Sequence, residues 1–180
     1  MRRVSVVGNT GSGKTVLAKA LAARLGMQHV ELDAIFHQAN WTPLPTDEFR
    51  RRVADAVAGD AWVVDGNYSS VRDLVWQRAD TVVWLDLSRV MVMRQLVART
   101  LRRMATGQEL WNANRERWRS LFDADESIIA WAWTQHAKYH ARYAAAAADP
   151  ANGHLTFVRL GSRTEVNRFL RSVRVATDAE

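Results

Sequence analysis

The chain has 180 residues, a length that suits one compact domain, and its 48% hydrophobic and 24% charged residues predict a globular protein. It contains no cysteine, which excludes disulfides, zinc–thiolate sites, iron–sulfur clusters and thiol nucleophiles. No apolar run approaches the roughly 20 residues of a membrane span, and the apolar stretch after Arg2 and Arg3 is too short for a signal peptide. We therefore expect a cytoplasmic protein with no membrane partner.

The net charge of +6 is concentrated in one part of the chain. Residues 89–119 hold eight arginines and two acidic residues, so this segment accounts for the whole excess. Arginine outnumbers lysine by 22 to 3, which suits forked binding of phosphate, although a GC-rich genome would give the same bias. A local basic segment in an otherwise neutral chain favours an anion clamp over a nucleic-acid face, because duplex binders show a more diffuse basic footprint.

Five short apolar runs have the character of strands, at residues 4–7, 29–32, 61–65, 81–85 and 155–160. They are nearly continuous in Val, Leu and Trp, which is typical of strands buried on both faces. Trp62 and Trp84 lie in these runs and are expected in the core. Because helical patterns separate the runs, the sequence predicts a five-stranded parallel sheet covered by helices.

Helical patterns follow in chain order. A helix at 14–25 is rich in Ala and Leu and stops at Gly26. A second helix, closed by Gly59, has an apolar stripe at Phe49, Val53, Ala56 and Val57. The basic segment has another such stripe, at Val90, Met93, Val97, Leu101 and Met104. Ser162 and Glu165 have the capping-box spacing at the start of the last helix.

About seventy residues between the fourth and fifth strands show no strand signal. They contain the arginines, a Trp-rich helical stretch and the alanine tract 144–148, which is predicted to end a helix before Asp149 and Pro150.

One motif carries chemistry. Gly8-Asn9-Thr10-Gly11-Ser12-Gly13-Lys14-Thr15 fits the pattern G-x-x-x-x-G-K-[ST], between a predicted strand and a predicted helix. Its glycines let backbone N–H groups converge on a phosphate at the positive end of the helix dipole. Lys14 is predicted to bridge the β- and γ-phosphates, and the Thr15 hydroxyl to ligate Mg²⁺. A chance glycine-rich turn is the weaker interpretation, so we expect a nucleoside triphosphate, taken as ATP, to bind here.

Three predicted strands end in an acidic residue, namely Asp33, Asp65 and Asp86. Ligands of parallel sheets bind beyond the carboxyl ends of the strands. One carboxylate is needed near Mg²⁺, and a second can accept the proton of an acceptor hydroxyl. The alternative for each is a turn or helix cap. We favour a functional role for Asp33 and Asp65, and a cap of the next helix for Asp86.

The segments that carry these residues resemble a known family. The phosphate-binding loop (P-loop), residues 31–33, the run Trp62-Val63-Val64-Asp65-Gly66-Asn67-Tyr68 and residues 78–86 resemble the adenylate-kinase-like P-loop superfamily. Within it the chain is most similar to the topology modulation protein branch, over essentially its whole length. The resemblance implies a three-layer P-loop fold of the nucleoside monophosphate kinase type, formed as a single domain over 1–180 with a mobile helical lid at about 89–148.

The resemblance also implies roles for individual residues. Asp65 would hold the magnesium shell through water, and lid arginines would close on the transferring phosphoryl group. The candidates are Arg94, which would contact the donor, and Arg99, Arg103 and Arg115. The loop at 158–162 resembles the one that contacts the base. Adenylate kinases have an arginine soon after the aspartate–glycine pair, whereas here Asn67 and Tyr68 follow and Arg72 comes later.

The acceptor side departs further from the adenylate kinases. Trp41 and Trp111, flanked by polar residues and proline, are candidates to line an acceptor pocket, and Arg72 is the candidate for acceptor phosphate. Arg99 and Arg103 share a helix face, where like charges repel unless an anion neutralises them, so phosphate contact is favoured over solvation.

These observations predict an enzyme that transfers the γ-phosphoryl group of Mg²⁺–ATP to a small acceptor, a nucleotide or another phosphorylated metabolite. Lys14, Asp33, Arg99, Arg103 and Arg115 are its predicted catalytic residues. Two alternatives stay open. One is a nucleotide-dependent regulatory or nucleic-acid-binding protein with incidental ATPase activity, and the other is a kinase-type toxin. The expected assembly is a monomer or a homodimer.

Overall fold

The structure is a computed structural model, and it describes residues 1–106, 112 and 128–173. Its strands are β1 (Arg3–Gly8), β2 (Gln28–Glu31), β3 (Trp62–Asp65), β4 (Thr81–Leu85) and β5 (Thr156–Leu160). They form one parallel sheet in the order β2-β3-β1-β4-β5. The chain order reverses at β1, so the carboxyl end of this central strand opens the crevice where such sheets bind ligands.

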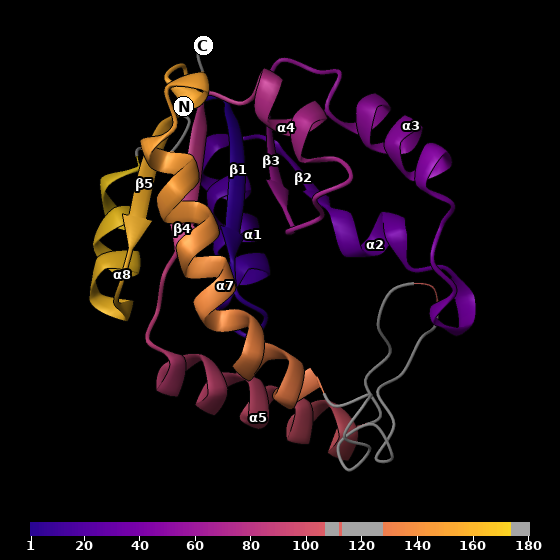
Figure 1. Cartoon of the computed structure of the whole chain (residues 1–180), viewed down its shortest axis with the longest axis vertical. Coiled ribbons are helices and arrows are strands. Elements are labelled where there is room, and N and C mark those ends of the chain that lie inside the picture. Colours follow the sequence, from indigo (N-terminus) through magenta and orange to yellow (C-terminus); the bar gives the residue numbers. More distant parts are fainter. Residues whose placement is uncertain (107–111, 113–127, 174–180) are drawn as a thin grey trace.

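Helices cover both faces of the sheet. In the described residues they are α1 (Lys14–Leu25), α2 (Leu32–Phe36), α3 (Thr46–Ala56), α4 (Arg72–Arg78), α5 (Arg89–Thr106), α7 (Ile128–Ala148) and α8 (Arg163–Ser172). Two 3-10 turns, η1 (Ala39–Trp41) and η3 (Pro150–Asn152), join them. Residues of α1 and α8 pack on one face, and residues of α3, α4 and α7 on the other (Figure 1). The sheet and these two helical layers make the three-layer α/β architecture that the sequence predicts.

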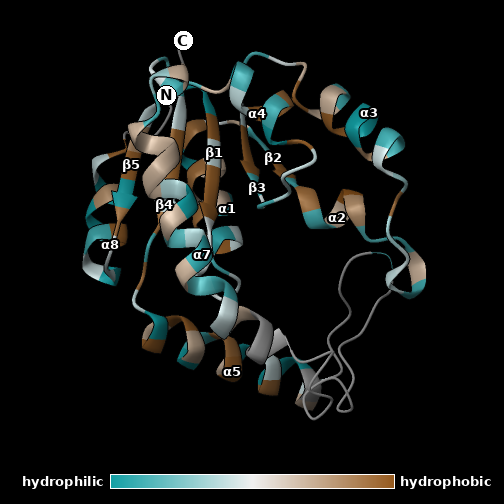
Figure 2. Cartoon of the chain, viewed as in Figure 1, coloured by the Kyte–Doolittle hydropathy of each residue, from teal (hydrophilic) through white to brown (hydrophobic). Residues whose placement is uncertain are grey.

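The strands show why the sequence pattern indicated them. Val4 and Val6 of β1 belong to the apolar core under α1, whereas Val7 belongs to the core under α3, α4 and α7. Because both faces are buried, β1 and β3 consist mainly of apolar residues (Figure 2). Trp62 and Trp84 are buried, as predicted. The predicted second strand, 29–32, is shifted by one residue, because β2 begins at Gln28 and Leu32 already belongs to α2.

The ends of three helices also follow the prediction. Gly26 adopts a left-handed conformation with φ 63° and closes α1. Ser162 accepts a hydrogen bond from the Glu165 N–H at 3.2 Å and caps α8, and Glu165 accepts one from the N–H of Gly161, the residue before the cap, in a variant of the capping box. Helix α7 ends at Ala148, ahead of Pro150.

The prediction for α5 is wrong about which face is buried. Val90, Val97 and Leu101 of the predicted stripe are 66%, 36% and 47% exposed, whereas Val92 and Leu96 are buried. The buried face therefore runs through residues 92, 96 and 100, with Arg99 half-buried beside it, whereas Val90, Val97 and Leu101 of the predicted stripe face outward.

Candidate functional site

The P-loop begins where β1 meets β4. Gly8 is opposite Leu85 and has φ 147°, and a Cβ atom at Gly8 would lie only 2.6 Å from the carbonyl oxygen of Leu85. Gly13 precedes α1 with φ 95°. Both positions require glycine, because an L side chain would be strained there and, at Gly8, would also collide with backbone. The loop thus packs tightly enough to present its backbone to a ligand.

The start of α1 is prepared for an anion. Among the residues that the structure describes, no side chain caps this helix, and its first turn contains no acidic residue. The backbone N–H groups of the first turn are therefore available to a phosphate, with the helix dipole behind them. The Ser12 hydroxyl is buried and has no hydrogen-bond partner among the described residues, which fits a site that a polar ligand completes.

Lys14 is the electrostatic centre of the site. Its Nζ donates a hydrogen bond to the carbonyl oxygen of Asn9 at 3.1 Å. Burial lowers the pKa of Lys14, Asp33 and Asp65 act in the opposite direction, and Arg99 lowers the pKa further. The fold therefore brings three other residues that the sequence singled out into electrostatic range of Lys14.

Each of the two carboxylates has its own partner. The Tyr68 hydroxyl donates to Asp33 Oδ1 at 2.7 Å and lies 3.3 Å from His37 Nε2. Burial and the neighbouring Asp33 raise the pKa of Tyr68, which keeps this phenol a donor. Asp65 is buried and lies 3.2 Å from His29 Nε2.

A cavity lies beside these residues, on the face of the sheet that α4 and α7 cover. The cavity is small, with room for about one water molecule (about 10 Å³), and it is partly open to solvent. Its lining includes Gly66, Asn67, Tyr68, Arg72, Trp76 and Tyr143. The Arg72 guanidinium lies 5.4 Å from the centre of the Trp76 ring, and this stacking fixes its position at the cavity.

The other predicted acceptor residues are placed as follows. Trp41 is 39% exposed, and its ring centre lies 5.3 Å from that of His37, next to the Asp33–Tyr68 pair. Trp111 and Arg115 lie outside the described residues.

Helix α5 carries the remaining cations. Arg99 lies on its inner face and acts on Lys14, and Arg103, one turn later, is half-buried. Arg94 is exposed, about 140° around the helix from Arg99, so this arrangement does not bring Arg94 to the P-loop.

Sequence reasoning missed three residues of the site, His29, Tyr68 and Gln95. The Gln95 Oε1 atom lies 3.8 Å from the position of a Cβ at Gly13, so its amide adjoins the P-loop. Its Nε2 group is buried without a hydrogen-bond partner in the described part of the chain. The signal for Gln95 was its i, i+4 spacing to Arg99, but the apolar stripe assigned the opposite face of α5 to the interior.

Asp86 does not cap α5, contrary to prediction. Its carboxylate pairs with the Arg159 guanidinium at 2.6 Å and with His140 Nδ1 at 2.9 Å. The first turn of α5 instead has Ser88, whose hydroxyl accepts a hydrogen bond from the Met91 N–H at 3.4 Å. Asp86 therefore ties β4, β5 and α7 together at the edge of the site.

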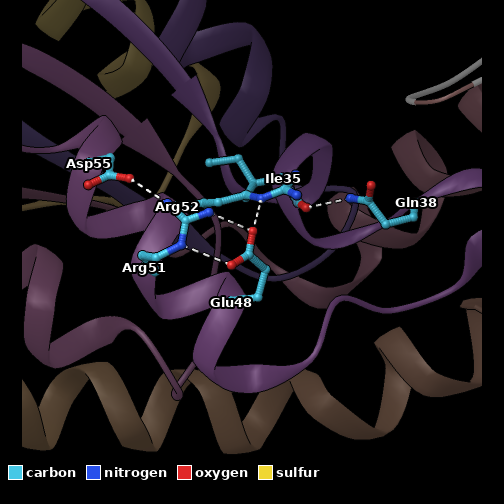
Figure 3. A network of polar contacts seen from close by, with 6 residues as sticks. All are labelled: Ile35, Gln38, Glu48, Arg51, Arg52 and Asp55. Carbon is cyan, nitrogen blue, oxygen red and sulfur yellow. Dashed lines mark hydrogen bonds and ion pairs between the residues drawn. The ribbon is translucent and has the colours of Figure 1, made fainter.

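Arginines on α3 belong to a surface network of ion pairs (Figure 3). Glu48 accepts hydrogen bonds from Arg51 and Arg52, which hold its pKa down to about 2. Arg51 also reaches Asp55, four residues on, at 3.2 Å. These cations therefore have acidic partners on their own helix.

The fold has clear counterparts among solved structures. The shikimate kinase of Acinetobacter baumannii, in complex with shikimate, matches with a TM-score of 0.55 and 15% identity over 96% of this chain and 90% of that chain. The shikimate kinase of Bacteroides thetaiotaomicron has a TM-score of 0.54 at 15% identity, and 94% of each chain is covered. A gluconokinase from Sinorhizobium meliloti 1021 has a TM-score of 0.50 at 18% identity over 94% of this chain and 87% of that chain.

Sequence comparison adds no closer relative, since no family model and no curated protein sequence matches the chain. Membership of the topology modulation branch therefore stays a prediction. No helix in the described ranges is long and apolar enough to cross a membrane. By its sheet order, its layers and these structural counterparts, the chain has the three-layer α/β fold of the P-loop kinases.

Proposed function

We propose that the protein transfers the γ-phosphoryl group of Mg²⁺–ATP to a hydroxyl group of a small anionic acceptor, such as a nucleotide or another phosphorylated metabolite. The observation that carries this proposal is the P-loop itself, whose uncapped helix start and Lys14, hydrogen-bonded through Nζ to the Asn9 carbonyl, lie where Asp33, Asp65 and Arg99 act on the lysine. Phosphoryl transfer needs little covalent chemistry from a protein, and positioning with charge neutralisation supplies most of the rate. The fold comparison supports the proposal, because its named counterparts are kinases of small molecules.

Asp33 has the contacts expected of a proton acceptor. The hydrogen bond from Tyr68 holds one carboxylate oxygen, and the other can face the acceptor hydroxyl. In the proposed step the acceptor oxygen forms a bond to the γ-phosphorus while the bond from that phosphorus to the bridging oxygen breaks. ADP leaves, and the hydroxyl proton passes to Asp33.

Lys14 and Arg99 would neutralise the charge that spreads over the transferring group. In the structure Lys14 Nζ is held by the Asn9 carbonyl, so its ammonium is already directed along the loop. Arg103 would join from the next turn of α5. Such cationic clamps are worth roughly 10³–10⁵ in rate in enzymes of this kind.

The residues present fit a magnesium ion bound with the nucleotide. Thr15, at the start of α1, would supply its hydroxyl, and the buried Asp65 would hold the ion through water. When bound, the ion would neutralise charge on the phosphates.

The acceptor would occupy the side of the crevice between Asp33 and Arg72. Arg72 offers a fixed cation for an anionic group, and the aromatic lining, including Trp76, offers apolar surface. In this placement Arg72 would take the role of the arginine that follows the aspartate more closely in adenylate kinases.

Lys14→Ala tests the donor site. We expect it to weaken Mg²⁺–ATP binding by roughly 10- to 100-fold, the range for a charged hydrogen bond, with the fold retained. Isothermal titration calorimetry measures the affinity, and an ATP-consumption screen over nucleotides and small hydroxylated metabolites identifies the acceptor.

Lys19→Ala is the matched control. Lys19 lies on the same helix, its side chain is 62% exposed, and it makes only a loose contact with Glu31 at 3.8 Å. ATP affinity should stay unchanged in this variant. Equal affinities for wild type and a folded Lys14→Ala protein would refute the proposed function.

A further inference from the structure

Asn67 follows the strand-end aspartate but has no role in the proposed transfer. The loop after β3 bends at Gly66, which has φ 142° and where a Cβ atom would lie 2.8 Å from the Leu32 side chain. The Gly66 N–H donates to the Val6 carbonyl at 3.4 Å, so the loop stays against β1. This close approach presents the Asn67 side chain to the first residue of the P-loop.

The Asn67 amide contacts both backbone groups of Gly8. Its Oδ1 accepts a hydrogen bond from the Gly8 N–H at 3.3 Å, and its Nδ2 donates to the Gly8 carbonyl. Backbone pairing between β1 and β3 ends with Val6 opposite Asp65. The amide therefore continues that ladder by one rung, and fixes the backbone where the P-loop begins.

Two tyrosines on the cavity side also contact the Asn67 amide. The Tyr143 hydroxyl donates to Asn67 Oδ1 at 3.0 Å, and a hydrogen bond with Asn67 also acts on the pKa of Tyr139. These two rings belong to α7 and stack with 9° between their planes. Tyr143 is buried, and both Tyr143 and Asn67 line the cavity assigned above to the acceptor.

We infer that Asn67 is a positioning residue that sets the geometry of the P-loop and couples it to Tyr143 in the wall of the cavity. The inference rests on the proposed function, since it takes the P-loop as the nucleotide site. Tyr143 lies on the cavity side of Asn67, and the P-loop on the other. The affinity for nucleotide should therefore depend on Tyr143 only through the Asn67 amide.

The test measures Mg²⁺–ATP affinity by calorimetry in four proteins, namely wild type, Asn67→Ala, Tyr143→Phe and the double variant. Asn67→Ala removes two hydrogen bonds to Gly8, and we expect binding to weaken by roughly 5- to 50-fold. Tyr143→Phe keeps the buried ring and removes one hydrogen bond, so it should weaken binding by roughly 2- to 5-fold. In the double variant the affinity should equal that of Asn67→Ala, because no amide is left to transmit the change.

Asn152→Ala is the matched control. The Asn152 amide donates to the Ala146 carbonyl at 2.9 Å, at the far end of α7, and so supports the same helix without contacting the P-loop. We expect it to leave ATP affinity unchanged. The thermal midpoint of each variant without nucleotide separates a loss of stability from a loss of affinity.

Several outcomes would overturn the inference. These are wild-type affinity in a folded Asn67→Ala protein, independent effects that multiply in the double variant, or an equal loss in Asn152→Ala. If Asn67→Ala does not fold, Tyr143→Phe decides, since an unchanged affinity there removes the coupling. A wild-type protein that binds no Mg²⁺–ATP would refute the proposed function together with the inference, whereas binding that is lost in Lys14→Ala but not in the Asn67 series would refute the inference alone.

Discussion

Asp33 and Asp65 both act on Lys14, but their different partners separate their roles. Tyr68 holds Asp33 on the acceptor side, whereas His29 lies beside the buried Asp65. The pairing of β2 with β3 places His29 opposite Val63, and so within reach of Asp65 two residues on. The two carboxylates are thus fixed at neighbouring strand ends with different surroundings.

We predict that Asp65→Asn raises the Mg²⁺ concentration needed for half-maximal ATP turnover, because it weakens the ion's outer shell by roughly 10-fold or more. Asp33→Asn should instead slow transfer to the acceptor while the affinity for ATP changes little. Magnesium titrations and calorimetry distinguish the two variants. Asp55→Asn, on the exposed surface of α3, serves as the control, and equal loss of ATP binding in both site variants would contradict the separation.

His37 gives the site a dependence on pH. Burial lowers its pKa below the ordinary value of 6.5, and the nearby Asp33 opposes this less strongly. Just below pH 6.5, His37 therefore binds a proton more readily in the unfolded chain than in the folded chain. Stability must fall as the pH decreases through that value.

We predict that the free energy of unfolding falls more between pH 7.5 and pH 5.5 in wild type than in His37→Gln. The Tyr68 proton goes to Asp33, so glutamine at position 37 can still donate a hydrogen bond to the Tyr68 oxygen, but it does not titrate. Urea unfolding at the two pH values measures the difference, and the other titratable groups are common to both proteins. An equal loss in the two proteins would show that His37 is protonated in the folded state as readily as in the unfolded one.

At the scale of single elements, the sequence identified what depends on contiguous residues. The P-loop is one run of eight residues, and helix α1 has the predicted bounds. Strands that are buried on both faces appear in the sequence as apolar runs, and this holds whichever strands lie beside them in the sheet. The partners of Asp33 and Asp65 could not be found in this way, because they depend on which strands become adjacent.

Helix α5 shows where a pattern misleads. Its apolar stripe predicted the buried face, yet Gln95 and Arg99 lie on the inner side with Leu96. A helix that lines a phosphate site must direct polar groups inward, so the hydrophobic period alone selects the wrong face. The Cβ position at Gly11 confirms the contact, since it lies 2.8 Å from Leu96 Cβ.

Helix α7 is held in place by long-range contacts that its own sequence pattern does not predict. The Asn9 amide donates to the Ala132 carbonyl at 2.9 Å, His136 Nε2 lies 2.9 Å from the Leu87 carbonyl, and His140 pairs with Asp86. These residues follow one face of the helix at i, i+4 and i+8. These hydrogen bonds join α7 to the loops after β1 and β4. The lid can extend to residue 148, as predicted, only if they break when nucleotide binds.

For the whole molecule, the main functional question is whether the basic segment, residues 89–119, binds phosphate as a lid or binds nucleic acid. Several arginines outside this segment pair with acidic residues, as Arg50 does with Asp73 at 2.7 Å and Arg51 with Glu48 at 2.8 Å. The excess of +6 thus remains with residues 89–119, whose described part is mostly α5. A lid and a nucleic-acid surface make opposite demands on the same residues, because a lid needs its cations inside and a duplex binder needs them on the surface.

The inward position of Arg99 favours the lid, and a double substitution tests it. We predict that Arg99→Ala with Arg103→Ala reduces phosphoryl transfer by orders of magnitude, because these charges act on the transition state more than on bound ATP. Binding to duplex DNA should stay weak near physiological salt, with a Kd of roughly 10⁻⁴–10⁻⁶ M, in wild type and variant alike. A coupled ATPase assay beside a fluorescence-anisotropy salt titration measures both, with Arg51→Ala and Arg52→Ala as a control that removes two cations from α3. Sub-micromolar DNA binding that the variant loses, with a shallower salt dependence and intact turnover, would make α5 a nucleic-acid surface, because each lost phosphate contact lowers the salt slope by about one.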